Sequence, residues 1–499
     1  MLTHRRTGVL VFAALATLGS ARESAAQQQP AGLTLEQAVS AAREENPDLL
    51  AQRNDQRAAR AATRSARADL LLPSASAQVD LGYTGPGVQR YGTEVFGTRP
   101  QYYSSGYYLG VGYDFSGAKL MQPRIARAQQ NATTRRVEGY EANMVSQVAQ
   151  QYLTALQAGE QVSQAEREVA RTVEHERLAK ARLDVGAGTP LDVRRAEVQR
   201  GQAEVTLLQR RNTYATEVLR LGQAMGRSIT ATTPLTSSFT LFEPRWTAEQ
   251  LIEMAQANNP NLASARANVT AARTGVSAAR TQYLPTVSLN AGVRGSVYSA
   301  GNLNPLYDAG IAGTGQRYSS CLQGNQLASL LGQPQRSCSE FDISNPAVVD
   351  SVRGAIKAAN PAFPFGYERQ PLSAGVTFSL PIFNGLQRER RVEEARVQAQ
   401  DAQLGLQAQE LRLRTEVETS LLALRTAYNA AQLQEQVVQR AGEELRLAQE
   451  RFRFGATSSV EVTDAQTSLR EAERARIDAV YNFHKSLAAL EALVGRPLR

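Results

Sequence analysis

The chain contains the same order of sequence marks twice, and this duplication constrains the fold more than any other feature. Residues 34–73 and 247–285 each begin on Thr, carry an Asn-Pro pair and end on a Leu-Pro pair. Each copy later closes on a Gly-Arg pair, at Gly226 and at Gly495. Because internal repeats mark one structural unit used more than once, we predict two structural repeats. They span residues 27–228 and 247–499, with an inter-repeat linker over residues 229–246.

The N-terminus has the pattern of an export signal. Arg5 and Arg6 precede an apolar run over residues 8–18, and a Ser-Ala-Ala sequence ends at residue 26. This pattern predicts a signal peptide over residues 1–26 that is cleaved on export. No later stretch approaches the ~18 to 20 apolar residues of a membrane helix, so membrane contact is expected from strands or a surface patch. The net charge of +8 is modest for 499 residues and does not indicate nucleic-acid binding.

Four segments alternate between apolar and polar or small residues, as strands with one apolar face do. In the first of them, Val79, Leu81 and Tyr83 alternate with polar or small neighbours. Strands of about ten residues with this pattern are typical of outer-membrane barrels. The expected strands lie at about 74–83, 103–115, 286–297 and 371–383.

Four strands cannot close a barrel by themselves. Open edges are not tolerated in hydrocarbon, because each unpaired N–H or C=O group costs several kcal/mol. We therefore expect a barrel shared between chains, and two, three or four protomers would give eight, twelve or sixteen strands. The alternative is a soluble antiparallel sheet with one face on a core.

Two very long helices are expected between the strands. Only Pro123 interrupts the stretches from Gly117 to Gly186 and from Gly385 to Gly455, so each helix can extend about 100 Å at 1.5 Å per residue. In the second copy the apolar residues step by four and three, which indicates coiled-coil packing rather than an ordinary bundle. The stripe begins with Val417, Leu421, Leu424, Tyr428 and Ala431 and resumes with Val438, Ala441, Leu445, Ala448 and Phe452. The predicted fold is mainly α with a small antiparallel β part.

The sequence offers no catalytic constellation. His4 lies in the signal, while His175 and His484 are isolated on predicted helices, where we expect them to be solvated. No local spacing assembles a Ser/His/Asp triad or a His/Cys metal cluster. We therefore expect no catalytic residue, no metal site and no cofactor, and we do not expect an enzyme.

The turns that end the long helices carry a pattern known from one family. Arg451 and Phe452 precede Gly455 and a Glu-Val-Thr-Asp-Ala sequence that starts at Glu461. The first-copy counterparts are Arg182, Leu183, Gly186 and the Asp-Val-Arg-Arg-Ala sequence at residues 192–196. Over nearly the whole mature chain, the sequence resembles the TolC-like outer-membrane efflux family. It departs from the family pattern at Glu461, where Asp is usual, and at Leu183, where an aromatic residue is usual.

The resemblance implies a homotrimer with a twelve-stranded barrel in the outer membrane, continued by an α-helical barrel in the periplasm. It also implies docking to a periplasmic adaptor protein and an inner-membrane pump. On this interpretation the protein passively conducts substrate to the cell exterior, within a tripartite efflux or type I secretion system. A soluble periplasmic coiled-coil adaptor or scaffold is the alternative, and extraction from envelopes without detergent would indicate it.

The tip turns are the predicted periplasmic gate, at Gly186 and Gly455. Glu461 and Asp464 are three residues apart, so their carboxylates project from nearly the same helix face. Threefold symmetry would gather six such groups around one axis and favour cations. The alternative is that they complement the dipole at a helix N-terminus. Asp192, the first-copy counterpart of Glu461, is a further gate residue. The basic residues expected to pair with neighbouring acids and hold the tips closed are Arg195, Arg451 and Arg453.

The connection over residues 298–370 is much longer than usual and is expected to be a loop at the cell surface. It contains Cys321 and Cys338, which are the only cysteines of the chain. An exported chain with two cysteines a short distance apart is expected to oxidise them, and we predict this disulfide. The alternative is a pair of unpaired thiols. Residues 348–360 are expected to form a short helix in this segment.

Overall fold

The computed structural model describes residues 32–498, so the predicted signal peptide over residues 1–26 lies outside the described residues. The chain forms two compact units, which are described separately. Unit 1 comprises residues up to 47, 143–245 and 420–490. Unit 2 comprises residues 48–142, 246–419 and 491–499.

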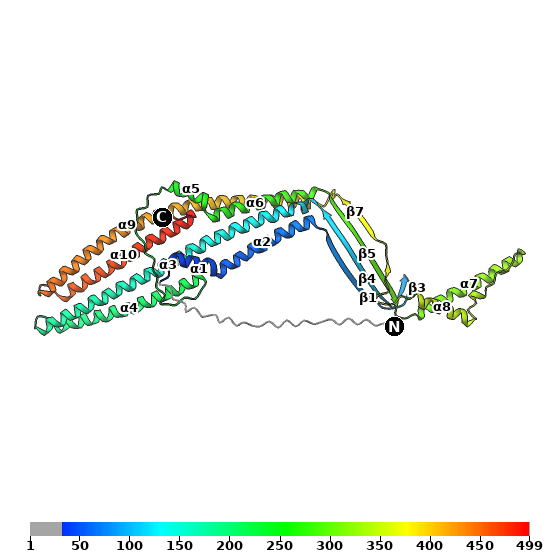
Figure 1. Ribbon diagram of the computed structural model, residues 1–499, viewed down its shortest axis with the longest axis horizontal. Helices are drawn as coiled ribbons and strands as arrows, with labels where there is room; N and C mark the ends of the chain where they lie inside the picture. Colours follow the sequence, from blue (N-terminus) through cyan, green and yellow to red (C-terminus); the bar gives the residue numbers. More distant parts are fainter. Residues whose placement is uncertain (1–31, 499) are drawn as a thin grey trace, which may run out of the picture. The chain divides into compact units, whose positions relative to one another are not determined.

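Unit 1 is built from two helical hairpins and one short helix, α1 (Leu35–Glu45) (Figure 1). The first hairpin joins the end of α3 (Gly117–Asp184) to α4 (Pro190–Met225). The second joins the end of α9 (Gln387–Arg453) to α10 (Ser459–Val494). The stripe predicted on α9 is buried in this unit at Leu421, Leu424, Ala431, Ala441, Leu445, Ala448 and Phe452. Its burial explains why these helices pair along their length.

Matching asparagine contacts occur at the start of each half of the chain. In unit 1, the Asn46 side chain donates to the Ala224 carbonyl at the end of α4, at 3.0 Å. In unit 2, the Asn259 side chain donates to the Leu493 carbonyl at the end of α10, at 2.8 Å. Gly226 adopts φ +84 beside Asn46, where a Cβ atom would lie 2.5 Å from the Asn46 Cα atom. Glycine is therefore required for this close approach.

The sheet of unit 2 contains all four predicted strands, β1 (Ser74–Thr84), β4 (Tyr102–Phe115), β5 (Thr286–Ala300) and β7 (Ser373–Ser379). They are antiparallel neighbours in the order β1-β4-β5-β7 (Figure 1). The register aligns Ala75, Val111, Ala291 and Ala374 in one row across the sheet. The apolar positions are therefore on one face, and that face is exposed on the edge strands: Leu81 of β1 and Phe378 of β7 are 70% and 75% accessible.

The segment expected to be a loop over residues 298–370 is largely helical, so this expectation was wrong. It contains α7 (Asn304–Leu330), α8 (Pro346–Ala359) and the two-residue strand β6 (Glu368–Arg369). The short helix predicted at residues 348–360 corresponds to α8. Cys321 of α7 and Cys338 form a disulfide with Cα atoms 5.9 Å apart. Another unpredicted element, the hairpin of β2 (Gly87–Tyr91) and β3 (Glu94–Arg99), follows β1.

The remaining helices of unit 2 form a layer. Contacts link α2 (Pro47–Leu71) to the start of α3, and α3 to α6 (Pro260–Arg280), which follows α5 (Ala248–Asn258). A hydrogen bond from Arg273 to Gln403 then links α6 to α9, and Arg391 of α9 donates to Gln282, just after the end of α6. None of the helices in the described part of the chain is both long enough and apolar enough to span a membrane.

Candidate functional site: the hairpin tips of unit 1

Both hairpins of unit 1 turn in the same way. Gly186 and Gly455 have φ of +75 and +77, the left-handed conformation that glycine adopts without strain. After α3 the Ala187 N–H donates to the Arg182 carbonyl, and after α9 the Ala456 N–H donates to the Arg451 carbonyl, both at 2.8 Å. These bonds satisfy the last free carbonyls of each helix, as in a Schellman motif. The sequence therefore fixes both tips locally.

Arg182 connects the two tips. Its guanidinium lies 4.3 Å from the centroid of the Phe452 ring and donates to the Phe452 carbonyl on the other hairpin. It also donates to the Ala187 carbonyl of its own turn, at 2.7 Å. The cation stacks on the ring face while its N–H groups satisfy two carbonyls, which is a geometry that a lysine cannot reproduce.

A second contact between the tips joins Asp192 and Ser459. The Ser459 hydroxyl donates to the Asp192 carboxylate at 2.5 Å, and Ser459 is buried. Asp192 also closes a capping box with Thr189 at the start of α4. The hydrogen bond from Ser459, followed by those from Thr189, lowers the pKa of Asp192, although its partial burial opposes the shift. The carboxylate is therefore held ionised between the hairpins.

The other predicted gate residues are arranged less closely. Glu461 accepts from Arg451 at 2.6 Å and from the Thr457 hydroxyl, so its charge is partly compensated within its own hairpin. Asp464, Arg195 and Arg453 are exposed, and none of them has an ion-pair partner among residues 32–498. The structure thus places Glu461 with Arg451, and Asp192 with the neighbouring hairpin.

His175 was expected to be solvated, and this was wrong: it is 4% accessible. Its ring lies 5.6 Å from that of Phe452, beneath the tip contact. Burial lowers the pKa of His175, while the nearby Asp192 charge acts in the opposite direction. His484 is also buried, at 1%, so the same expectation was wrong there. Both histidines are buried because other elements pack against their helices. The residue pattern of a single helix does not predict such packing.

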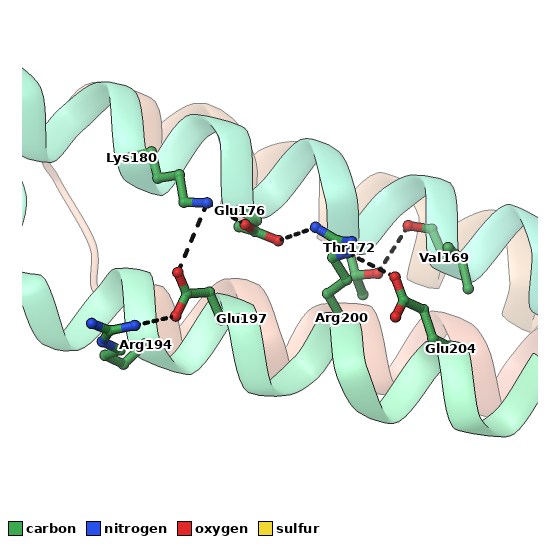
Figure 2. Close-up of polar contacts among 8 residues, drawn as sticks. All are labelled: Val169, Thr172, Glu176, Lys180, Arg194, Glu197, Arg200 and Glu204. Carbon is green, nitrogen blue, oxygen red and sulfur yellow. Dashed lines mark hydrogen bonds and ion pairs between the residues drawn. The ribbon is translucent and has the colours of Figure 1, made fainter.

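A ladder of charges fastens α3 to α4 below the first tip (Figure 2). Glu176, whose side chain is 8% exposed, accepts from Lys180 at 2.5 Å and from Arg200 at 3.3 Å. Lys180 also lies 3.8 Å from Glu197. Two further ion pairs lie within α4: Arg194 with Glu197 and Arg200 with Glu204, each at 2.8 Å. The ladder sets the register of this hairpin, because its central bonds cross from one helix to the other.

Farther from the tips, α3 and α10 are joined by polar side chains. Arg171 makes two bonds to Glu473, at 2.9 and 2.8 Å, and also pairs with Glu168. Gln157 and Gln161 both donate to the Asp478 carboxylate, at 2.6 and 2.9 Å. The two hairpins are therefore linked by charge-assisted hydrogen bonds over several turns, which are stronger than neutral ones.

The sequence pattern had marked Arg182 as the counterpart of Arg451 without giving it a role at the gate. The pairing of Arg182 with Phe452 links residues 270 positions apart, which no local spacing encodes. No group of three or more His, Cys, Asp or Glu side chains between residues 32 and 498 is arranged to hold a metal ion.

Comparison with known proteins identifies the family. The sequence model described as outer membrane efflux protein matches residues 38–227, 251–327 and 345–496. The chain is 26% identical over 235 residues to the outer membrane efflux protein BepC of Brucella suis. That alignment covers 47% of this chain and 50% of BepC, so it spans about half the length of this curated relative.

Solved structures of the same fold are more distant in sequence. CusC is 18% identical with a TM-score of 0.66, covering 93% of this chain and 92% of that chain. The outer membrane protein VceC of Vibrio cholerae is 16% identical with a TM-score of 0.65, covering 93% and 97% of the two chains. At these identities the likeness shows the fold.

Proposed function

This chain belongs to the outer membrane efflux protein family, and on that basis we propose that it is the outer-membrane channel of a tripartite efflux or type I secretion system. It passively conducts substrate from a periplasmic pump and adaptor to the cell exterior. The family match favours this function over the alternative of a soluble adaptor or scaffold. It also favours a channel over an enzyme, because the family is one of channels.

The observation that carries the proposal is the exposed apolar face of the sheet in unit 2. Val79, Leu81 and Phe378 on the edge strands β1 and β7 are 67%, 70% and 75% accessible. Such a face is costly in water and suits the hydrocarbon of a bilayer. Among the described strands, β1 pairs only with β4, and β7 only with β5.

Those two strand edges support a homotrimer. In a bilayer, unpaired N–H and C=O groups of an edge strand have no water to bond, so neighbouring chains must supply the missing strands. Three copies of β1, β4, β5 and β7 give the twelve-stranded barrel that the resemblance to TolC-like proteins implies. In this proposal the hairpin tips of unit 1 are the periplasmic gate.

The test is the behaviour of the purified mature protein. We expect a trimer by native mass measurement in detergent and discrete conductance steps in planar bilayers. A monodisperse monomer that leaves the envelope without detergent and conducts nothing would support the soluble alternative. N-terminal sequencing of the same preparation tests the predicted cleavage after residue 26.

Docking to an adaptor is proposed at the tips. Val185 and Phe454, 78% and 82% accessible, are apolar side chains at the two turns. A photo-crosslinker at either position is expected to capture a periplasmic adaptor protein. A crosslinker at Leu411, which is 69% accessible on α9 in unit 2, is the control. Equal capture from all three positions would contradict docking at the tips.

A further inference from the structure

Two adjoining cavities in unit 2, both open to solvent, are lined by exposed arginine side chains. The larger, of about 950 Å³, is lined by Arg67 of α2, Arg124 and Arg127 of α3, and Arg273 of α6. The smaller, of about 550 Å³, is lined by four arginines of α2, and it shares Arg67 and Gln130 with the larger. These are Arg57, Arg60, Arg64 and Arg67.

The spacing of these arginines puts them on one face of the layer of helices. On α2 they recur at intervals of three and four residues, so they share one side of the helix. The facing side of α3 is fixed by Thr63 of α2, whose hydroxyl donates to the Ala126 carbonyl at 3.2 Å. Three helices therefore contribute cations to the same hollow.

Four acidic residues of α2 and α3 pair with basic residues that do not line the cavities. Asp55 pairs with Arg136 at 2.9 Å, Asp69 with Lys119 at 3.4 Å, and Glu138 with Arg135 at 2.8 Å. Glu141 pairs with Arg53 at 3.2 Å. The sequence of α6 contains no acidic residue at all.

The cavity arginines consequently lack counter-charges in the protein. Within residues 32–498, no carboxylate lies at ion-pair distance from Arg60, Arg64, Arg67, Arg124 or Arg127. Crowded cations without acids repel one another, and a bound anion relieves that repulsion. Gln130, Asn131 and Thr134 add neutral hydrogen-bonding groups to the lining.

We propose that the joined cavities bind small organic anions that carry several carboxylate, sulfonate or phosphate groups. The guanidinium forks of Arg64, Arg67 and Arg127 engage these groups bidentately, as guanidinium does with planar or tetrahedral oxyanions. Anion binding itself does not depend on the proposed function. Only the further step, that the bound anion is a transported substrate, rests on the proposed function. A negatively charged substrate class is then favoured in this part of the path.

The probe is pyrene-1,3,6,8-tetrasulfonate, titrated against the full-length protein in neutral detergent and followed by fluorescence anisotropy. We expect saturable binding that weakens as KCl rises, because the contacts are between charges. The triple variant Arg64→Gln, Arg67→Gln, Arg127→Gln is expected to lose at least about tenfold in affinity. The matched control, Arg390→Gln, Arg396→Gln, Arg414→Gln on α9, removes the same charge outside the cavity and should stay within about twofold of the unmodified protein.

Each outcome decides the proposal. Absence of saturable binding to the unmodified protein, or equal loss in both triple variants, overturns it. If phosphatidylglycerol in mixed detergent micelles binds through these arginines but the tetrasulfonate does not, the site is for lipid headgroups and the proposal fails. A cavity variant that no longer assembles is replaced by the single variant Arg64→Gln, for which a smaller loss is expected. If the protein binds the tetrasulfonate but does not conduct in bilayers, the proposed channel function is wrong and the anion site stands. If it conducts but does not bind the tetrasulfonate, the anion site is wrong and the channel function stands.

Discussion

The guanidinium of Arg182 lies 4.3 Å from the centroid of the Phe452 ring and also donates to the Phe452 carbonyl. One side chain of the first hairpin thus holds the ring and the backbone of the second. If the tips form the gate, opening requires that this contact break or move with both hairpins together.

We predict that Arg182→Ala loosens the tips and raises the fraction of time that single channels spend in high-conductance states. The loss of the stacked cation and its hydrogen bonds is worth about 2 kcal/mol. Single-channel recording in planar bilayers measures the effect. Arg194→Ala, which loses only its exposed pair with Glu197 on the same helix, should record like the unmodified channel. Identical open fractions for both variants would contradict a gating role for Arg182.

Replacing Glu461 and Asp464 tests the predicted acidic constriction. The double variant Glu461→Gln, Asp464→Asn keeps the shape of both side chains and removes their charge. We expect reversal potentials in a salt gradient to shift away from cation selectivity, and block by multivalent cations to weaken. Because Arg451 already pairs with Glu461, we expect the Asp464→Asn single variant to account for most of the change. Unchanged selectivity in the double variant would contradict the acidic constriction. The alternative, that the two carboxylates only complement the dipole at the helix N-terminus, would then stand.

Acidification should weaken the packing beneath the tips. Burial keeps the pKa of His175 below the ~6.5 of an unfolded histidine. Between these two pKa values the unfolded chain binds more protons than the folded one, so stability falls as pH drops below about 6.5. Hydrogen exchange of the α3 and α9 ends at pH 7.5 and 5.5 measures this loss. In His175→Gln the difference in hydrogen exchange between pH 7.5 and pH 5.5 should shrink. If that difference is undiminished, a group other than His175 causes the loss of stability.

Reduction of the bond between Cys321 and Cys338 should loosen the α7 segment without unfolding the sheet. A crosslink over 17 residues stabilises its loop by about 3 kcal/mol. Limited proteolysis of Cys321→Ser, Cys338→Ser is expected to cut between residues 321 and 338 faster than in the unmodified protein, while the heat resistance of the protein as a whole stays the same. Equal cleavage rates would show that α7 and α8 hold this segment without the crosslink.

Features encoded locally were predictable from the sequence. Gly186 and Gly455 end helices in the left-handed conformation, and the alternating residues from Val79 onward form a strand at the expected position. Helix α7 escaped prediction because its apolar residues follow no single face and glycines are scattered among them. The tip contacts escaped for a different reason: Ser459 and Asp192 are 267 residues apart, and only tertiary packing brings them together.

The asparagine contacts at Asn46 and Asn259 bear on how such a chain arose. Each ties the beginning of one half to the last turn of the helix that ends it, so the two ends of each half lie together. A segment whose ends already meet can be copied in tandem and joined by a short connector, since neither copy must be opened to make the fusion. With the two repeats predicted from the sequence, the segment over residues 229–246 would be such a connector, and a gene duplication followed by divergence would need no further rearrangement of the backbone.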